Sequence, residues 1–233
     1  MMETMMADKL RIGFVLFPNV TQLDFTGPLQ VLSRVPGAEV HLLWKRIEPL
    51  TSDTVLTFLP TTTFAACPQL DVICVPGGAG ADDAMLDEET IAFLQQQAHA
   101  ARYVTSVCTG ALVLGAAGLL KGYRAATHWS ARPFLAQFGA ILDTSRVCVD
   151  RNRVTGGGVT AGIDFALTLV SIMSDRKTAE MIQLGIEYNP APPFNAGSPD
   201  TAPADVVAAV TERAGGWKQR EAKAKRAAER LGA

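Results

Sequence analysis

Short runs of consecutive hydrophobic residues, rich in β-branched side chains and bounded by Gly or Pro, recur along the chain. Such runs are typical of strands that are buried on both faces in a parallel sheet. We predict four of them, at residues 10–16, 40–44, 71–75 and 103–107. Stretches with helical patterns lie between and after them, at residues 27–35, 88–101, 111–117, 131–138 and 163–173. This alternation predicts a doubly wound α/β fold, a mostly parallel sheet flanked by helices.

The C-terminal half departs from this alternation. Residues 139–156 predict a small peripheral antiparallel excursion, with short strands at 140–142, 146–149 and 153–155. After Tyr188 the sequence NPAPPFNAGSPDTAP cannot be helical and predicts an extended strap over the surface. The strap leads to a last helix, predicted over residues 204–231, which ends in the basic stretch KQREAKAKRAAERL. A solvated helix face explains this charge, and contact with a partner or an anionic surface is the alternative.

The domain organisation follows from length and composition. No linker divides the 233 residues, so one domain with one core is expected. We expect residues 1–9, which begin MMETMM, to be disordered or ambiguous in their start site. Residues 10–203 form the α/β domain of this prediction. Residues 204–233 form a basic C-terminal helix that packs on this domain or extends from it.

Charge and hydropathy exclude several partner classes. The formal net charge is −2, which argues against nucleic acid as a partner of the main body. No apolar run approaches the roughly 20 residues that a membrane-spanning helix needs. The N-terminus lacks the pattern of a signal peptide, so we expect a cytoplasmic protein without membrane contact.

The four cysteines contain no C-x-x-C pair, which argues against a zinc ribbon, a thioredoxin-type motif and a disulfide scaffold. Cys108 follows the predicted strand 103–107 and precedes a helix, in the sequence SVCTGA. This arrangement is typical of a nucleophile elbow, which exposes the side chain at the top of a sheet. The N–H groups at the helix start favour the thiolate, so we predict Cys108 as the nucleophile. Cys74 and Cys148 fit buried, inert positions, and Cys67 fits a loop.

A second strand leads into the glycine-rich turn VPGGAG. It lacks G-K-[ST], and Asp83 replaces the third glycine of a dinucleotide fingerprint, so nucleotide binding is unsupported and no cofactor is expected. The Gly78 amide could instead pair with the Thr109 amide as an oxyanion-type donor set. Turn geometry alone is the alternative explanation of these glycines.

The first strand leads toward Asp24, in the sequence LDFTGP. One interpretation is a helix N-terminal cap. The other is a carboxyl group in an apolar cleft near the thiol, with a raised pKa and an acid/base role. In that case the two groups titrate as a coupled pair.

The remaining candidates have weaker signals. Of three histidines only His128, in ATHW, is a plausible site residue, and a structural role beside Trp129 is the alternative. The sequence shows no ligand cluster for a metal, and none is expected. The run TGGGVTAGID before another helix permits close approach to the cysteine turn, so we expect it to form the back wall of the pocket.

Taken together, the segments LDFTGP, PGG, SVCTGALVLGAAGLL, ATHW and GGGVTAGIDFAL resemble the ThiJ/PfpI superfamily over residues 10–205. Within it the chain is most similar to the isocyanide hydratase branch, which the strap EYNPAPPFNAGSP also matches. The resemblance implies a flavodoxin-like sheet, a homodimer, Cys108 as nucleophile, Asp24 as its acid/base partner, and Gly78 and Thr109 as pocket amides. Many superfamily members carry Glu at the position of Asp24, and the peptidases carry Cys followed by His, so peptidase activity is not expected here.

These residues suit one reaction in particular. Attack of a thiolate on an isocyanide carbon, with a proton from Asp24, gives a thioimidate, and water then releases an N-substituted formamide without a cofactor. Two other functions stay open: a cysteine-based sensor or binding module, and another thiol enzyme of the superfamily with glyoxalase or deglycase activity. Regulators with a similar sensor domain carry a helix-turn-helix module, for which a single basic helix is too short.

Overall fold

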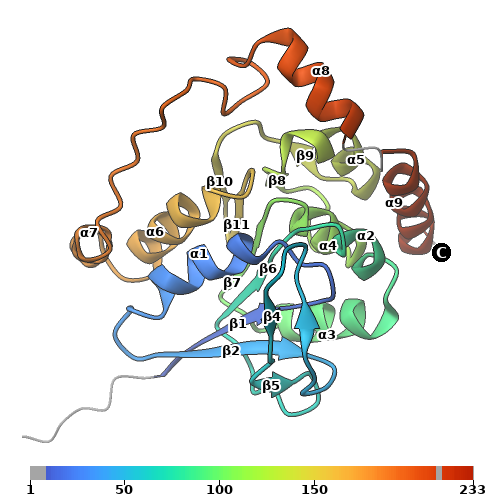
Figure 1. Cartoon of the computed structure of the whole chain (residues 1–233). Coiled ribbons are helices and arrows are strands. Elements are labelled where there is room, and N and C mark those ends of the chain that lie inside the picture. The colour runs from blue at the N-terminus through green and yellow to red at the C-terminus, as the bar shows by residue number, and fades with distance from the viewer. Residues whose placement is uncertain (1–8, 214–216, 233) are drawn as a thin grey trace, which may run out of the picture.

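The computed structural model describes residues 9–213 and 217–232. Within these residues the centre of the fold is a seven-stranded sheet in the order β10-β11-β7-β6-β1-β2-β5 (Figure 1). Its strands are β1 (Leu10–Val15), β2 (Ala38–Trp44), β5 (Thr62–Thr63), β6 (Val72–Val75), β7 (Tyr103–Val107), β10 (Val147–Asp150) and β11 (Arg153–Gly156). Every neighbouring pair is parallel except β10 and β11. The prediction of a mostly parallel, doubly wound sheet is confirmed.

Helices cover both faces of this sheet (Figure 1). One face carries α1 (Gln22–Leu32) and α6 (Ala161–Met173), with α7 (Arg176–Gly185) packed against α6, and the other carries α2 (Ala81–Ala84), α3 (Glu88–Ala98) and α4 (Gly110–Ala116). The segment 129–138 forms the short helices η1 (Trp129–Ala131), α5 (Arg132–Leu135) and η2 (Ala136–Phe138). Two small sheets pair β3 (Leu50–Thr51) with β4 (Thr57–Phe58) and β8 (Arg124–Ala125) with β9 (Ile141–Leu142).

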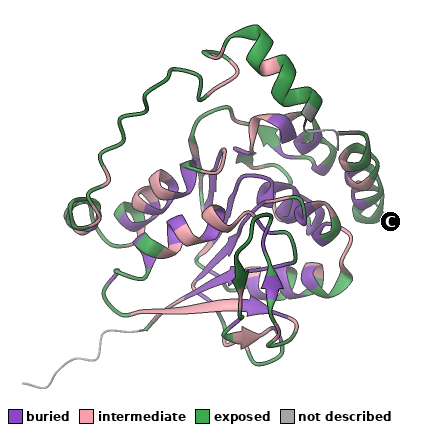
Figure 2. Ribbon diagram, viewed as in Figure 1, coloured by how far each residue is buried: buried purple, intermediate pink, exposed green. Residues whose placement is uncertain are grey.

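The buried residues concentrate on the central strands and on the helix surfaces that face them (Figure 2). All four residues of β6 are buried, as are the last four of β7. Strands buried on both faces therefore form the middle of the sheet, as their sequence pattern predicts. The four predicted strands are confirmed.

Two predictions about local structure were wrong. Helix α1 begins at Gln22, five residues before the predicted start, and contains Pro28. The Pro28 ring lies against Gly162 of α6, where an added Cβ would be 3.0 Å from Pro28 Cδ, so interhelical packing retains the proline inside the helix. The antiparallel segment after residue 139 was predicted to be peripheral, but its last strand, β11, is fully buried and pairs with β7 inside the main sheet.

The single helix predicted over residues 204–231 was also wrong. The structure has two helices there, α8 (Ala204–Arg213) and α9 (Trp217–Leu231). The residues between them, 214–216, lie outside the described part and include Gly215 and Gly216, which are poor helix formers. The disorder predicted for residues 1–9 likewise falls almost entirely outside it. Between α7 and α8, the predicted strap has no helix or strand over residues 189–203 and is largely exposed.

Helix α9 packs on the domain through both small and charged side chains. Ala224 and Ala227 are buried. Arg220 Nε lies 2.7 Å from Asp82 Oδ1, and Lys223 Nζ lies 2.5 Å from Asp83 Oδ1, so the helix pairs with acidic residues of α2. Part of its basic charge is therefore neutralised within the chain. The helices of the described residues are too short or too polar to cross a membrane.

Candidate active site

Cys108 lies at the sharp turn between β7 and α4, with φ of 57°. A positive φ is strained for a residue with a side chain, and surrounding hydrogen bonds must hold it. The Cys108 N–H donates to the carbonyls of Gly156 (3.1 Å) and Gly157 (2.8 Å). Its carbonyl accepts from Thr127 Oγ1 at 2.8 Å. The predicted elbow is present, and the glycine run after β11 lies behind it as expected.

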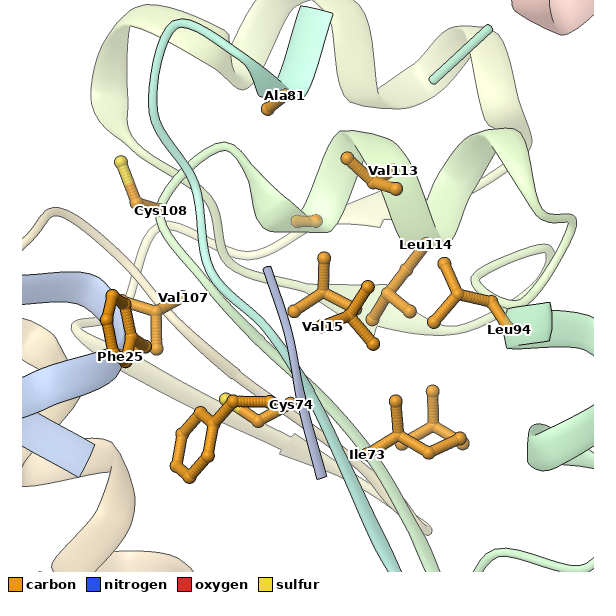
Figure 3. Close-up of a cluster of buried hydrophobic side chains, with 14 of the residues drawn as sticks. Val15, Phe25, Ile73, Cys74, Ala81, Leu94, Val107, Cys108, Val113 and Leu114 are labelled. Atoms are coloured by element: carbon orange, nitrogen blue, oxygen red, sulfur yellow. The ribbon is translucent and has the colours of Figure 1, made fainter. Parts of the chain in front are cut away.

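Gly110, which follows Cys108 and Thr109, allows the turn to pack closely against the sheet. Gly110 begins α4, and an added Cβ there would lie 2.0 Å from the Val75 carbonyl oxygen. Only glycine permits this approach of α4 to β6. Figure 3 shows the Cys108 side chain directed away from the core cluster that contains Val107 and Ile73. Cys74, on β6, lies within that cluster, and burial raises the pKa of its thiol to about 12.

Asp24 is the third residue of α1 and is fully buried. The helix cap is Thr21, and Asp24 Oδ2 instead accepts a hydrogen bond from the Gly77 N–H at 2.8 Å. Its other oxygen, Oδ1, is buried and makes no contact of full hydrogen-bond geometry among the described residues, and the Cys108 side chain also interacts with this carboxyl group. The capping interpretation of Asp24 is therefore excluded, and one carboxyl oxygen is left free to carry a proton.

Burial sets the proton affinity of the Asp24 carboxyl group. It raises the pKa to about 7, against smaller lowering effects from the Gly77 N–H and the Cys108 side chain. An unpaired charge in this apolar environment loses its hydration, which favours the neutral acid. Asp24 thus exchanges its proton near neutral pH.

Cys108 is only 5% exposed, and the pKa of its thiol lies well above the ordinary value. Burial is the largest cause, and the negative charge of Asp24 adds to it. The N–H and hydroxyl of Thr109 act in the opposite direction, as the helix-start argument predicts, but they are outweighed. The two groups therefore form a coupled pair in which a negative charge on one raises the pKa of the other.

Thr109 and Gly78 meet across the site. The Gly78 N–H donates to Thr109 Oγ1 at 2.9 Å, and Thr109 Oγ1 donates to the Gly78 carbonyl at 3.2 Å. The Gly78 amide predicted as a substrate donor is therefore occupied by the Thr109 hydroxyl here, while the Thr109 N–H faces Cys108. Gly78 has φ of 127° and bridges to Val20, which fixes the turn.

Sequence reasoning missed Gly77 and Thr127. Both act through one hydrogen bond, to Asp24 and to the Cys108 carbonyl. The P-G-G turn was the available signal for Gly77, and the position before His128 gave none for Thr127. His128 Nδ1 lies 2.8 Å from Ser130 Oγ and caps η1, so it has a structural contact beside Trp129. Within residues 9–213 and 217–232, no three His, Cys, Asp or Glu side chains are grouped to hold a metal ion.

A family model described as the DJ-1/PfpI family matches residues 10–172, which contain all of these site residues. The chain belongs to the DJ-1/PfpI family. The ThiJ/PfpI resemblance seen in the sequence is thereby confirmed, and the mostly parallel sheet flanked by helices is the flavodoxin-like fold of this family.

Known proteins are similar to this chain over different shares of their length. Isonitrile hydratase from Pseudomonas putida is 59% identical over 205 residues, which cover 88% of this chain and 90% of that protein. The HTH-type transcriptional regulator GbdR from Pseudomonas aeruginosa is 31% identical over 179 residues, 73% of this chain but 48% of the regulator. The crystal structure of a ThiJ/PfpI family protein from Pseudomonas syringae superimposes with a TM-score of 0.90 at 46% identity, covering 95% of this chain and 91% of that one.

Proposed function

We propose that this chain is an isocyanide hydratase, a hydro-lyase that adds water to an isocyanide R–N≡C and releases an N-substituted formamide. The observation that carries this proposal is the 59% identity with isonitrile hydratase, isonitrile being another name for isocyanide, over nearly all of both chains. The site supports it. Cys108 is only 5% exposed, which suits a substrate whose reacting carbon is the unhindered end of a linear group.

The first step uses both members of the coupled pair. The Cys108 thiol proton moves to the Asp24 carboxylate, which leaves a thiolate beside a neutral carboxylic acid. The thiolate sulfur attacks the terminal carbon of the isocyanide, and Asp24 donates its proton to that carbon. The product is the thioimidate R–N=CH–S–Cys108, with Asp24 as carboxylate. The pKa of about 7 suits Asp24 to both the acid and the base form of this step.

Hydrolysis of the thioimidate returns the pair to its starting state. The Asp24 carboxylate takes a proton from water as the water oxygen adds to the carbon, and then passes that proton to the nitrogen. The adduct R–NH–CH(OH)–S–Cys108 collapses when Asp24 removes the hydroxyl proton. The C–S bond breaks and the formamide R–NH–CHO leaves. Cys108 is again a thiolate beside a protonated Asp24, so one water is consumed for each turnover.

Thr109 supports the negative charge on sulfur in this scheme. Its N–H and hydroxyl both lower the pKa of Cys108. Since the Thr109 hydroxyl is engaged with Gly78 on both sides, it is fixed in position at the start of α4. In the proposed reaction the Thr109 N–H stabilises charge on the sulfur, and Gly78 lines the site and holds the Thr109 hydroxyl in position.

Turnover of a simple isocyanide tests the proposal. The purified chain is incubated with an aryl isocyanide and with an alkyl isocyanide, and the formamide is followed by absorbance. We expect turnover by the wild type and by the control Cys67→Ser, whose cysteine lies outside the site, and none by Cys108→Ser. Absence of turnover by the wild type with both substrates contradicts the function. Undiminished turnover by Cys108→Ser contradicts the nucleophile.

The two alternative functions predict other outcomes. A cysteine sensor binds or becomes oxidised without producing formamide, and a glyoxalase or deglycase acts on carbonyl compounds instead. The raised pKa of Cys108 disfavours rapid oxidation, because the thiolate is the reactive form. Incubation with hydrogen peroxide and with a 2-oxoaldehyde, compared with an isocyanide under the same conditions, separates the three functions.

The proposed enzyme is a homodimer. Large apolar side chains of α7 and the strap are exposed in the single chain: Met181 is 66% exposed, Leu184 82% and Phe194 79%. A second copy that covers them removes this area from water. Sedimentation at micromolar concentration should give twice the chain mass, and a monomer contradicts the proposal.

We also propose that the enzyme is cytoplasmic. All four cysteines are free thiols, as is usual in a reducing compartment. Fractionation of the source cells, with detection by an antibody, tests this location, and recovery in the periplasm or medium contradicts it.

A further inference from the structure

A pocket of about 420 Å³ adjoins the cysteine elbow. It lies between the segment that follows β8, the loop before β10, the start of α6 and the strap, and its lining residues are Thr127, His128, Trp129, Arg132, Thr144, Ser145, Arg146, Gly157, Gly158, Val159, Thr160, Gly197, Ser198 and Pro199. Two of them, Thr127 and Gly157, hydrogen-bond the Cys108 backbone. The pocket therefore borders the backbone of the Cys108 turn.

The lining is basic and contains no carboxylate. The charge of Arg146 is balanced by Asp164, which is not a lining residue, because Arg146 Nε donates to Asp164 Oδ2 at 2.7 Å. Arg132 has no such partner: its hydrogen bond to the Thr144 carbonyl is long, at 3.4 Å, and its buried Nε has no acceptor in the described part of the chain. An arginine without a counter-ion in a concave site favours a carboxylate or another anion as ligand.

Neutral donors surround this charge. Ser130 donates to His128 Nδ1 from its N–H, at 3.3 Å, so the ring proton resides on Nε2, which has no acceptor in the described residues. Burial, with Arg220 and Arg132 nearby, lowers the pKa of His128, so the ring is neutral at pH 7. The N–H groups of Gly158, Val159 and Thr160, before α6, also lack acceptors there.

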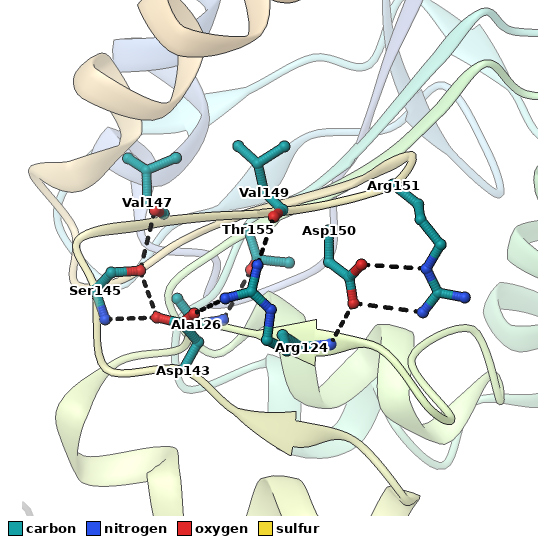
Figure 4. A network of polar contacts seen from close by, with 9 residues as sticks. All are labelled: Arg124, Ala126, Asp143, Ser145, Val147, Val149, Asp150, Arg151 and Thr155. Atoms are coloured by element: carbon teal, nitrogen blue, oxygen red, sulfur yellow. Dashed lines mark hydrogen bonds and ion pairs between the residues drawn. The ribbon is translucent and has the colours of Figure 1, made fainter.

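Hydrogen bonds behind the pocket hold its walls in place. Figure 4 shows Asp143 accepting from the Ser145 N–H and from Arg124, at 2.9 Å and 3.2 Å. It also shows the Ala126 N–H donating to Oγ1 of Thr155, a residue of β11; the bond length is 2.8 Å. This bond attaches the segment that leads to Thr127 and His128 to the main sheet. These bonds are independent of any ligand, so the donors are arranged in advance.

Trp129 gives the pocket an apolar side. It also lines a neighbouring groove of about 140 Å³ with Val206, Val207 and Val210 of α8. A ligand with a hydrocarbon or aryl body and one acidic group matches this combination of Trp129 and Arg132.

We propose that this pocket binds an acidic group on the substrate, with Arg132 as the specificity-determining residue. The substrate class is an isocyanide whose R group carries a carboxylate. This inference rests on the proposed function. It assigns Arg132 a contact with the substrate away from the reacting carbon, so Arg132 affects which isocyanide is selected and takes no part in the proton transfers.

A matched pair of substrates tests the assignment. The wild type is assayed with 4-isocyanobenzoate and with its methyl ester, which differ in charge at the end remote from the isocyanide. We expect kcat/KM to be about tenfold higher for the acid, and Arg132→Gln to abolish this ratio. The control Arg102→Gln removes the same charge at the opposite end of β7 and should leave the ratio unchanged. Equal values for the two substrates in the wild type, or a ratio that Arg132→Gln leaves intact, overturns the proposal.

A binding experiment separates this proposal from the proposed function. Calorimetry measures the affinity of 4-formamidobenzoate and of its methyl ester, neither of which requires turnover. We expect the acid to bind about tenfold more tightly than the ester, competitively with isocyanide substrate, and to lose this advantage in Arg132→Gln. If neither isocyanide is turned over while the acid still binds through Arg132, the hydratase function fails and the acid site stands. Binding that is equal for acid and ester, or unaffected by Arg132→Gln, overturns the acid site.

Discussion

Asp24 and Gly77 are joined by a hydrogen bond of 2.8 Å from the Gly77 N–H to Asp24 Oδ2, across 53 positions of sequence. It connects the start of α1 with the turn after β6, and it leaves Oδ1 unpaired in a buried environment. An added Cβ at Gly77 would lie 2.8 Å from Asp24 Oδ2 and 2.5 Å from the Thr109 N, so glycine is required for this contact. The P-G-G turn thus orients the Asp24 carboxyl group beside Cys108.

The pH dependence of turnover should follow the coupled pair. Below about pH 7 the pair holds two protons, as thiol and neutral acid, and contains no thiolate. Above it the pair holds one proton, which is the reactive state, until the thiol titrates with a pKa well above 9.0. We therefore expect kcat/KM to rise with pH up to about 7 and then to stay level to about pH 9. Initial rates of formamide formation between pH 5 and 10 measure the profile, and a rate independent of pH near 7 contradicts it.

Asp24→Asn should separate the proton donor from the nucleophile. The variant keeps a carbonyl oxygen to accept from Gly77 but cannot deliver a proton, so turnover should fall by on the order of 10² or more. The remaining titration is that of the thiol, so the rising limb near pH 7 should disappear and move above pH 9. Near wild-type formamide production by the folded variant would remove Asp24 from the mechanism.

The same substitution should change how stability depends on pH. The pKa of Asp24 is about 7 in the folded chain against 3.8 for the free group, so the folded state binds the extra proton more tightly. The resulting stabilisation is complete below pH 3.8 and is lost as the pH rises through 7. Relative to Asp24→Asn, the wild type should therefore lose on the order of 4 kcal/mol of unfolding free energy between pH 4 and 8.

Urea denaturation at several pH values measures this difference. The control is Asp175→Asn at the cap of α7, where hydrogen bonds from Thr178 lower the pKa of the carboxyl group. That group stabilises the folded state above the unfolded pKa and loses its effect as the pH falls, so its trend has the opposite sign. If the unfolding free energies of the wild type and Asp24→Asn depend on pH in the same way, the pKa of Asp24 is not raised in the folded state and the prediction is wrong.

Local pattern was enough to predict some of the site. Cys108 lies between a strand and a helix in the segment 103–110, so the elbow could be predicted from residues adjacent in sequence, although distant residues hold it in place. The glycine run after residue 155 was expected behind it, and the carbonyls of Gly156 and Gly157 do accept from Cys108. The family resemblance added a role for Asp24 that local pattern alone left undecided between cap and acid.

Contacts that depend on strand order could not be predicted. The bond between Asp24 and Gly77 exists because β1 and β6 are neighbours, and hydrophobic runs do not specify that order. The apolar pattern also placed Arg132 on a simple helix and gave no sign of its pocket, which forms only when the loop at 144–146 and the strap at 197–199 meet it. Helix α1 was predicted to start at residue 27 and begins at Gln22, with Pro28 inside it.

Substitution of Thr109 tests the hydrogen bonds between its hydroxyl and Gly78. Thr109→Val keeps the side-chain shape but leaves the Gly78 N–H without its acceptor, at a cost of about 1–3 kcal/mol. Thr109→Ser retains the hydroxyl and serves as the matched control. We expect Thr109→Val to lower kcat about tenfold and to unfold at lower urea, with Thr109→Ser within about twofold of the wild type. Equal kcat values for the two variants would mean that the hydroxyl is dispensable and that only the Thr109 amide acts.

The last prediction concerns the glycine that brings α4 against β6. In Gly110→Ala the new Cβ would lie 2.0 Å from the Val75 carbonyl oxygen, which is backbone and cannot rotate away. The elbow must then shift, so we expect a loss of at least about 3 kcal/mol in unfolding free energy and loss of turnover.

Gly185→Ala is the matched control for that substitution. Gly185 is the last residue of α7, and an added Cβ there meets nothing within 4 Å, so alanine should be neutral or stabilising by about 0.5–1 kcal/mol. Urea denaturation and formamide production are measured for both variants beside the wild type. Because the two changes add the same methyl group, a difference between them reports on the space at the elbow. A Gly110→Ala variant as stable and active as Gly185→Ala would mean that the close approach of α4 to β6 is not needed to present Cys108.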